Sequence, residues 1–433
     1  MRSERTWGIW ALSSDFLRAI NFCEAVIDGT HDSPKQVEDG RKLVTSKNVV
    51  GGKLDLENCY NISQEDFEQI NKRSKVYQWD ILMSMIGTVG EICILKDEPD
   101  YAIKNVGVFR AKNESDAKWL YYYLISPNAQ FEIYSRLRGS TQKFLPLGEL
   151  RNFPILKPAN EERKSSIINQ LFSIDCLISS NERLNDKVSE LIWAFFRSWF
   201  IDFDPVKAKA EGKLPYGMDE ETAALFPDSF KDSELGSIPT GWKIVTISDI
   251  CDLVSRGVTP DYEDGTGRWI INQKVNYGVN LNLENLKELS KSCIVPEGKF
   301  AKRFDVLVNC LGEGTLGRIH FFNGDSNYYA VDQHMSICRA KSSSVGLYIY
   351  HTLSSPTGQW RIDSVKTGST GMTMFNISKL RAFKIYIPPQ RILDKFWDRA
   401  SDLIHLSRSC VETRNRLAHT RDALLPRLMS GEL

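Results

Sequence analysis

The chain has 433 residues, of which 42% are hydrophobic and 11% aromatic, so it can bury more than one core. Its 55 basic and 55 acidic residues cancel, which excludes a strongly basic body and confines any nucleic-acid site to a local patch. Nine scattered cysteines without a Cys-x-x-Cys pair argue against a disulfide framework or a zinc knuckle. With neither an export signal nor a membrane span in the sequence, we expect a cytoplasmic protein.

Residues 1–158 are predicted to form a first α+β domain. Short runs of β-branched and aromatic residues, separated by Gly, Asn, Asp and Pro, indicate strands over 42–50 and 81–86. A helix is expected over 117–137 with an interruption at Pro127, and a β-like run then ends at Pro158.

A long amphipathic helix is predicted over 159–203. Its apolar positions step by three, four or seven residues, which is the spacing of a heptad seam, and Asn181 fills the one polar position. The apolar set is Ile174, Leu177, Leu184, Val188, Leu191 and Phe195. Residues 204–240 are rich in proline and glycine and predict a linker.

The second half repeats this order. Residues 241–388 are expected to form a second domain, with strands over 269–272 and 306–308 and a helix over 345–365 that is interrupted at Pro356. A second long helix and its tail occupy 389–433. Its apolar residues recur at intervals of seven, as Phe396, Leu403, Cys410, Leu417 and Leu424. Because a narrow apolar stripe needs one helical partner, the two long helices are expected to pair with each other.

The two halves also match in sequence, at an offset of about 225 to 230 residues. Among the ordered matches, Asp80–Gly87 parallels Asp305–Gly312, Ser126-Pro127 parallels Ser355-Pro356, and Gly139-Ser140-Thr141 parallels Gly368-Ser369-Thr370. We therefore predict an α+β fold of two repeated α/β globular domains, separated by two long antiparallel helices that form an intramolecular coiled coil.

The order domain, helix, linker, domain, helix resembles the specificity subunit of Type I restriction-modification systems. Three local motifs carry the likeness, which covers essentially the whole chain: Asp202-Phe-Asp-Pro205-Val-Lys-Ala-Lys, Leu235-Gly-Ser-Ile-Pro239-Thr-Gly241-Trp242, and the tail Arg421-Asp-Ala-Leu-Leu-Pro426-Arg-Leu-Met-Ser-Gly431-Glu-Leu433. The first half departs from the pattern, because it opens Thr6-Trp-Gly-Ile-Trp10 and lacks the Pro-x-Gly-Trp motif. The N-terminal edge of the first domain is therefore the least defined boundary.

The resemblance implies a non-catalytic DNA-binding subunit with two target recognition domains, over 1–158 and 241–388. Each would read one half of a split double-stranded DNA sequence, and the helices would fix the distance between the halves. The resemblance further implies two modification subunits that methylate adenine with S-adenosylmethionine, and restriction subunits that use ATP and magnesium. It implies no cofactor and no metal on this chain.

The clearest candidate for a DNA contact is the loop from Arg136 to Lys143, which gathers three cations, two hydroxyls and an amide around Gly139 without an acidic residue. Cations can neutralise phosphates, and Arg or Gln can pair with base edges. The alternative is a glycine turn with solvated charges. The candidate residues are Arg136, Arg138, Ser140, Thr141, Gln142 and Lys143, with Lys366, Ser369 and Thr370 as their counterparts in the second half.

A second pair of candidate sites follows an early strand in each domain. It comprises Ser46 and Lys47 in the first half, and Gln273 and Lys274 in the second. These residues differ between the halves, as readers of two half-sites should, and turn chemistry is the alternative. Further loop residues are interpreted as ordinary surface, namely His31 with Asp28, and Arg256 with Asp261 and Tyr262. We interpret Asp80 and Asp305 as structural turn residues.

No methyl-transfer site is apparent, because the Pro388-Pro389 pair is followed by Gln390 rather than by the aromatic residue of an adenine-methyltransferase motif. Two other hypotheses stay open. One is a stand-alone nuclease that uses Asp261, Glu297 and Lys299 as a carboxylate–lysine metal site. The other is a coiled-coil interaction protein without DNA contact.

Overall fold

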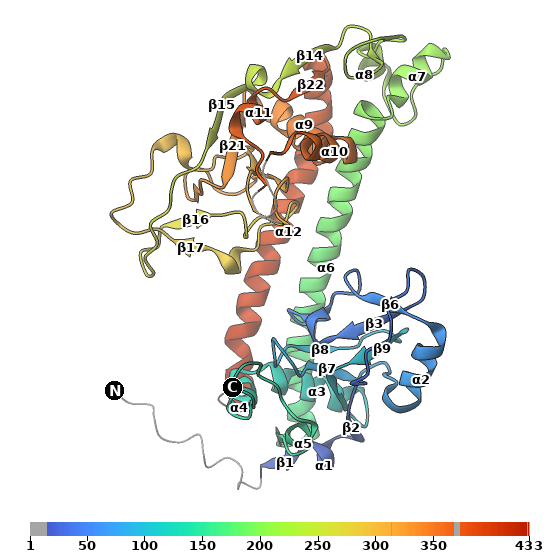
Figure 1. The fold of residues 1–433 in the computed structure, drawn as a ribbon, viewed down its shortest axis with the longest axis vertical. Helices are drawn as coiled ribbons and strands as arrows, with labels where there is room; N and C mark the ends of the chain where they lie inside the picture. The colour runs from blue at the N-terminus through green and yellow to red at the C-terminus, as the bar shows by residue number, and fades with distance from the viewer. Residues whose placement is uncertain (1–14, 313, 368–372, 431, 433) are drawn as a thin grey trace. The chain divides into compact units, whose positions relative to one another are not determined.

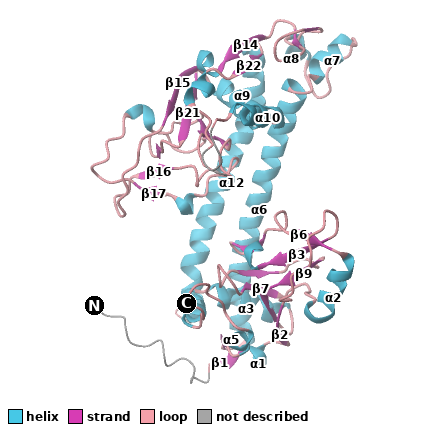
Figure 2. Ribbon diagram, in the orientation of Figure 1, coloured by secondary structure: helices cyan, strands magenta, loops and turns pink. Residues whose placement is uncertain are grey.

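The computed structural model describes residues 15–312, 314–367, 373–430 and 432, and it divides into two compact units. The first unit comprises residues 1–180 with 414–433, and the second comprises residues 181–413. Each unit holds one globular domain and a segment of each of the two long helices (Figure 1). Both units mix helices and strands, which confirms the predicted α+β class (Figure 2).

Eleven strands build the first domain's sheets among the described residues: β1 (Phe16–Arg18), β2 (Ala25–Asp28), β3 (Arg41–Thr45), β4 (Val49–Val50), β5 (Lys53–Leu54), β6 (Tyr60–Ile62), β7 (Ile81–Ser84), β8 (Ile92–Ile94), β9 (Tyr101–Lys104), β10 (Val106–Arg110) and β11 (Pro154–Leu156). The central sheet is antiparallel, in the order β2–β10–β7–β8. Strand β7 is buried on both faces, because Ile81 and Met83 join one apolar cluster and Leu82 joins another. A smaller sheet, β6–β3–β9, contains one parallel pair.

The helices of this domain are α1 (Ala19–Phe22), α2 (Gln64–Ser74), α3 (Glu114–Ile125), α4 (Pro127–Ser135) and α5 (Leu147–Arg151). The predicted interruption lies between α3 and α4. Ser126 ends α3 and caps α4, since its hydroxyl donates to the Tyr123 carbonyl (2.6 Å) and accepts from the Ala129 N–H (3.4 Å). Pro127 then occupies the first turn of α4, where its missing N–H removes no helical hydrogen bond.

The second domain repeats this arrangement. Its strands are β12 (Phe230–Lys231), β13 (Ile238–Pro239), β14 (Lys243–Thr246), β15 (Cys251–Arg256), β16 (Trp269–Ile271), β17 (Lys287–Glu288), β18 (Val306–Asn309), β19 (Ile319–Phe321), β20 (Ala330–Val331), β21 (Met335–Ala340) and β22 (Lys384–Ile387). The central order is β15–β21–β18–β19, and the smaller sheet is β17–β16–β20, again with one parallel pair. Its helices are α9 (Ser343–Ser354), α10 (Pro356–Val365) and α11 (Ile377–Arg381), with Ser355 and Pro356 at the break.

A buried ion pair recurs at the start of each central strand. Arg110 donates two bonds to the carboxylate of Asp80 (3.0 and 2.7 Å), and Arg339 does the same to Asp305 (3.0 and 2.7 Å). Burial raises the pKa of both aspartates, while the bidentate guanidinium opposes that shift. Both aspartates therefore act in the framework.

Residues 204–240, predicted as a linker, form the short helices α7 (Asp204–Ala210) and α8 (Glu220–Ala224) and the strand pair β12–β13. Their apolar side chains are buried in the main core of the second unit: Val206, Met218, Ala223, Phe226 and Ile238. The segment is therefore an ordered part of that unit.

The two long helices are α6 (Glu161–Phe200) and α12 (Gln390–Ser430). Within each unit their segments run side by side (Figure 1). In the first unit Arg421 Nη1 donates to Asp175 Oδ1 (3.0 Å), and in the second Ser407 Oγ donates to Asn185 Oδ1 (2.6 Å). Residue numbers thus rise along one helix as they fall along the other, which confirms the antiparallel pairing. None of the described helices is long and apolar enough to cross a lipid bilayer.

The predicted seam is right for α12 and half right for α6. In α12, Phe396 and Cys410 are buried and the other three predicted residues are half-buried. In α6, the row Ile174, Val188 and Phe195 is buried or half-buried, but Leu177, Leu184 and Leu191 are 52%, 44% and 43% exposed. The buried row is instead Leu171, Asn185 and Ile192. The prediction that Leu177, Leu184 and Leu191 lie in the seam was wrong because it selected positions by their apolarity, whereas the seam contains the polar Asn185.

Candidate nucleic-acid interface

Two glycine loops occupy equivalent positions in the two domains. Gly87 lies three residues after the end of β7, and Gly312 three residues after the end of β18. Both have left-handed backbone angles, with φ of +83° and +112°. A side chain at either position would strain the turn, so the glycines preserve the path of the loop.

In the first domain a hairpin lies against this loop. Two backbone bonds of 2.9 Å join Arg138 and Phe144, and Gly139 turns the chain with φ of +90°. Ile86 pairs with Phe144, and the Gly87 N–H donates to the Lys143 carbonyl (3.4 Å). The predicted loop therefore sits on the glycine loop as one surface.

The tip of this hairpin is open to solvent. Ser140, Thr141, Gln142 and Lys143 are all exposed. Arg138 is also exposed, by 64% of its side chain, although its Nη2 lies 2.7 Å from Glu149 Oε1. The tip can therefore present an amine, hydroxyls and an amide to a ligand.

Arg136 lies at the base of the hairpin and not at its exposed tip. Its guanidinium is bound by Glu132 (Nε to Oε1, 2.7 Å) and Glu149 (Nη1 to Oε2, 3.2 Å), and it lies over the ring of Phe153. Hydrogen bonds from Arg138 and Arg136 lower the pKa of Glu149, which keeps that carboxylate charged between them. Arg136 thus anchors the base of the hairpin instead of offering a free cation.

The second candidate group of the first domain divides in the same way. Ser46 is buried: its hydroxyl donates to the Asn105 carbonyl and accepts from the Met85 N–H (3.2 Å). It therefore fixes the approach to the Gly87 loop and cannot contact DNA directly. Lys47, its neighbour, is exposed.

In the second domain the residues that correspond to these candidates also lie at the glycine loop. The Gln273 carbonyl accepts from Asn309 Nδ2 (2.9 Å), and a Cβ on Gly312 would stand 3.5 Å from Gln273 Cγ. Two backbone bonds of 3.0 and 2.8 Å join Thr367 and Met374, as two join Arg138 and Phe144, and Met374 pairs with Leu311. Lys274 is exposed, and Lys366 is exposed with its amine 2.7 Å from Asp363. Ser369 and Thr370 lie outside the described residues.

Beside each glycine loop lies a pair of polar side chains that are distant from each other in the sequence. His31 Nδ1 is 2.8 Å from Asn105 Oδ1 in the first domain, and Thr259 Oγ1 donates to Gln333 Oε1 (2.9 Å) in the second. The two partners are 74 residues apart in both cases. Local motifs cannot show such a pair, because the offset between the halves equates His31 with Thr259 but does not give their partners, which lie 74 residues further along the chain.

The residues of the nuclease hypothesis have separate partners. Lys299 donates to the Arg256 carbonyl, Glu297 pairs with Lys302 (3.3 Å), and Asp261 accepts from Ser292 (3.4 Å). Among the described residues no group of three or more His, Cys, Asp or Glu side chains could hold a metal ion. The structure thus gives this hypothesis no support.

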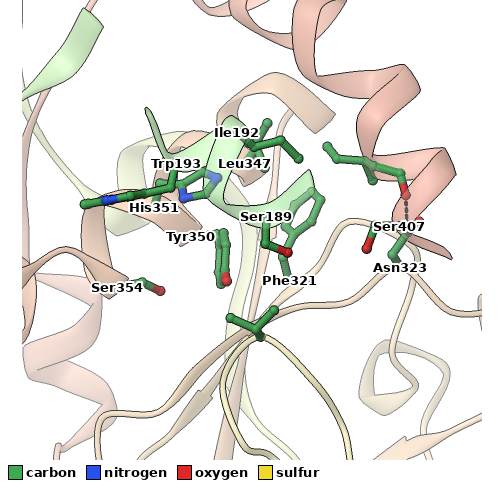
Figure 3. A pocket seen from close by; sticks show the side chains of 12 residues that line it. Ser189, Ile192, Trp193, Phe321, Asn323, Leu347, Tyr350, His351, Ser354 and Ser407 are labelled. Atoms are coloured by element: carbon green, nitrogen blue, oxygen red, sulfur yellow. Dashed lines mark hydrogen bonds between the residues drawn. The ribbon is translucent and has the colours of Figure 1, made fainter. Parts of the chain in front are cut away.

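The second unit also contains a pocket of about 260 Å³ between its helix segments and the domain (Figure 3). Its lining is Ser189, Ile192, Trp193, Val279, Phe321, Asn323, Leu347, Tyr350, His351, Ser354, Ile404 and Ser407. None of these side chains is cationic at neutral pH, since burial lowers the pKa of His351 to about 3. The pocket therefore does not suit a phosphate backbone.

The first unit fills the equivalent place with polar side chains. Asp175 and Ile404 are equivalent positions, since each lies the same number of residues after the start of its long helix. Tyr122 and His351 are also equivalent, because each lies four residues before the serine of the helix break, Ser126 or Ser355. In the first unit Tyr122 and Arg421 both donate to the Asp175 carboxylate (2.7 and 3.0 Å). The two domain–helix contacts thus share their geometry but differ in polarity.

The family model for the Type I restriction modification DNA specificity domain matches this chain twice, over residues 26–190 and 239–411. The two matches cover the two domains and parts of the two long helices.

Individual proteins and one solved structure show the same likeness. The chain is 21% identical to the Type I restriction enzyme HindI specificity subunit of Haemophilus influenzae, over 73% of this chain and 77% of that protein. It is 24% identical to the MjaIX specificity subunit of Methanocaldococcus jannaschii, over 82% and 77%. The crystal structure of a Type I restriction-modification S subunit from M. genitalium matches with a TM-score of 0.50 at 12% identity, over 96% of this chain and 97% of that one, which is a likeness of fold.

Proposed function

Since the chain belongs to the Type I restriction modification DNA specificity family, and is a specificity subunit, we propose that each of its two domains reads one half of a two-part DNA target. One observation carries this proposal: the two domains share their sheets, their glycine loops and the backbone pairing beside them, while the exposed residue at that pairing differs, Arg138 in the first domain and Thr367 in the second. A shared framework with different contact residues is what two unlike half-sites require.

The paired helices supply the connection between the domains. Each helix runs from one unit into the other, with 40 residues in α6 and 41 in α12. At 1.5 Å per residue, a helix of this length extends about 60 Å. We propose that this length sets the number of unread bases between the half-sites, as dimer geometry sets half-site spacing in other DNA readers.

The outer face of α6 is our candidate for recruiting two modification subunits. Leu184 and Leu191 form an exposed row, seven residues apart, on the part of α6 in the second unit. Such a row favours the apolar stripe of a helix from another chain. Replacing Leu184 and Leu191 by Glu should abolish co-purification of the modification subunit while the chain stays folded, whereas Asp186→Lys, an exposed position on a different face of the same helix, should leave it unchanged.

We further propose that the chemistry belongs to the partner subunits. The modification subunits would bind S-adenosylmethionine and methylate adenine, and restriction subunits, when they join, would use ATP and magnesium. On this proposal the chain supplies recognition alone and acts in the cytoplasm, where the genomic DNA is.

Methylome sequencing of the source strain, with and without this gene, tests the central proposal. A split adenine-methylation motif should disappear when the gene is deleted and return when it is restored. If no such motif depends on the gene, the proposal is wrong. Cleavage of plasmid DNA by the purified chain with magnesium, lost in Glu297→Ala, would instead support the nuclease hypothesis.

A further inference from the structure

We propose that Asn105 and Gln333 read equivalent bases in the two half-sites, each held in place by its partner side chain, His31 or Thr259. The ligand is the major-groove edge of a base, and the amide group favours adenine, whose N6 and N7 match an amide oxygen and an amide N–H. This inference rests on the proposed function, because it assigns specificity to residues within those domains.

In the first domain the Asn105 amide is fixed at one end. His31 Nδ1 lies 2.8 Å from Asn105 Oδ1, and His31 Nε2 lies 3.1 Å from Asp28 Oδ2. Asp28 is buried and also accepts from Arg73 (3.1 Å), so the histidine is anchored in turn. Within the described part of the chain the other end of the Asn105 amide has no protein partner.

The second domain builds the same arrangement from different side chains. Thr259 donates to Gln333 Oε1, and the Gln333 amide nitrogen has no partner among the described residues. The backbone is equivalent too: the Asn105 N–H donates to the Thr30 carbonyl (3.1 Å), and the Gln333 N–H donates to the Val258 carbonyl (2.8 Å). Parallel bridges join Thr30 to Lys104 and Val258 to Asp332.

Both amides lie next to the candidate interface. The Asn105 carbonyl accepts from Ser46, whose hydroxyl accepts from the Met85 N–H two residues before Gly87. In the second domain the carbonyl of His334, next to Gln333, accepts from the Cys310 N–H (2.9 Å), two residues before Gly312. Each amide is thus continuous with the glycine loop and hairpin of its own domain.

A comparison of residue types between the two domains distinguishes side chains that read bases from side chains that only support the loop. Framework positions keep their residue type in both domains, as the glycines and the Asp–Arg ion pairs do. This pair keeps its geometry but changes from His–Asn to Thr–Gln. The amide is retained while its reach changes by one methylene, so the two domains can meet the same kind of base at different depths.

The test is the methylome of cells that carry the chain with its modification subunit. Asn105→Asp keeps the size and the left-handed backbone of this residue (φ +55°) but removes the amide donor. Gln333→Glu makes the same change in the other domain. We expect each variant to lower methylation at the wild-type motif by about tenfold or more and to relax one adenine position, in one half-site only.

The matched control is Gln69→Glu, the same chemical change at an exposed position on α2, which should leave the motif intact. If Asn105→Asp folds poorly by thermal unfolding, Asn105→Gly keeps the turn and removes the amide, and Gln333→Glu gives an independent result. Wild-type methylation by the Asn105 and Gln333 variants overturns this inference and leaves the proposed function intact. The absence of any gene-dependent split motif in the wild type overturns both.

Discussion

Arg136 and Arg138 lie two residues apart in one loop, but their side chains differ in exposure and in their acidic partners. Glu132 and Glu149, which lie outside that loop in sequence, bind the Arg136 guanidinium, whereas most of the Arg138 side chain faces solvent. A count of charges along the sequence treats the two alike. Whether a cation of this loop is available to a ligand therefore depends on the acidic residues that the fold brings to it.

Lys143→Ala should weaken DNA binding and reduce the slope of log affinity against log salt by about 1, because one phosphate contact and its counterion release are lost. Arg138→Ala should act in the same direction. The measurement is a salt titration of binding with the modification subunit present. Lys213→Ala, an exposed lysine paired with Glu211, is the control. Unchanged slopes in both hairpin variants would assign the hairpin a purely structural role.

His351 makes the stability of the second unit depend on pH. Burial among uncharged groups lowers its pKa to about 3, and its ring stacks on Phe196 at 5.0 Å. In the unfolded chain this imidazole takes up a proton near pH 6.5, whereas in the native chain it stays neutral at that pH. The free energy of unfolding is therefore highest above pH 6.5 and falls as the pH drops below it. The loss should reach about 2 kcal/mol at pH 5.

Urea unfolding at pH 7 and pH 5 measures this loss. His351→Phe should lessen the difference between the two pH values, although buried His320, whose pKa is lowered to about 4, will retain a part of it. Tyr350→Phe, beside His351 on α9, removes a hydroxyl that does not ionise between pH 5 and 7 and should leave the difference unchanged. An unaltered pH dependence in His351→Phe would contradict the argument.

Among the elements, those defined by local chemistry were predictable from the sequence. The Ser-Pro break between α3 and α4 and its copy between α9 and α10 follow from capping and proline geometry. The seam of α6 was not predictable, because leucines lie on two faces of that helix and the buried row contains Asn185. The His31–Asn105 pair also escaped, since only strand pairing in the folded domain brings those side chains together.

The domain–helix contact of the first unit contains the ion pair between Asp175 and Arg421, and we expect removal of one partner alone to be destabilising. Arg421→Met would leave the carboxylate of Asp175, 12% exposed, with Tyr122 as its remaining partner, and should destabilise the first unit by about 3 kcal/mol. Replacing both Asp175 and Arg421 by Ile copies the apolar Ile404 and Ile192 of the second unit. Urea unfolding should show that this double variant regains more than half of the loss. A double variant as unstable as Arg421→Met would refute this view of the contact.

At the scale of the whole molecule, the first domain depends on residues from the far end of the chain. Leu425, Leu428 and Met429 of α12 belong to the same apolar cluster as Ile167 and Leu171 of α6. The second unit, in contrast, draws on residues 181–413 alone. Neither domain boundary along the sequence reveals this arrangement.

A chain that stops after Thr413 should therefore lose the integrity of its first domain and keep that of its second. Burial of three large apolar side chains is removed, at about 2 kcal/mol each. Hydrogen exchange should show faster opening of β7 and β10 and unchanged protection of β18 and β21. The reverse distribution of protection would contradict this division into units.

The same arrangement has a consequence for synthesis on the ribosome. Residues are added from the N-terminus onward, so every residue of the second unit is synthesised before Leu425, Leu428 and Met429, which complete the first core. The first domain therefore keeps its helix-facing surface unfilled until residues 425–429 have been synthesised. The domain that is made first is the last to be finished.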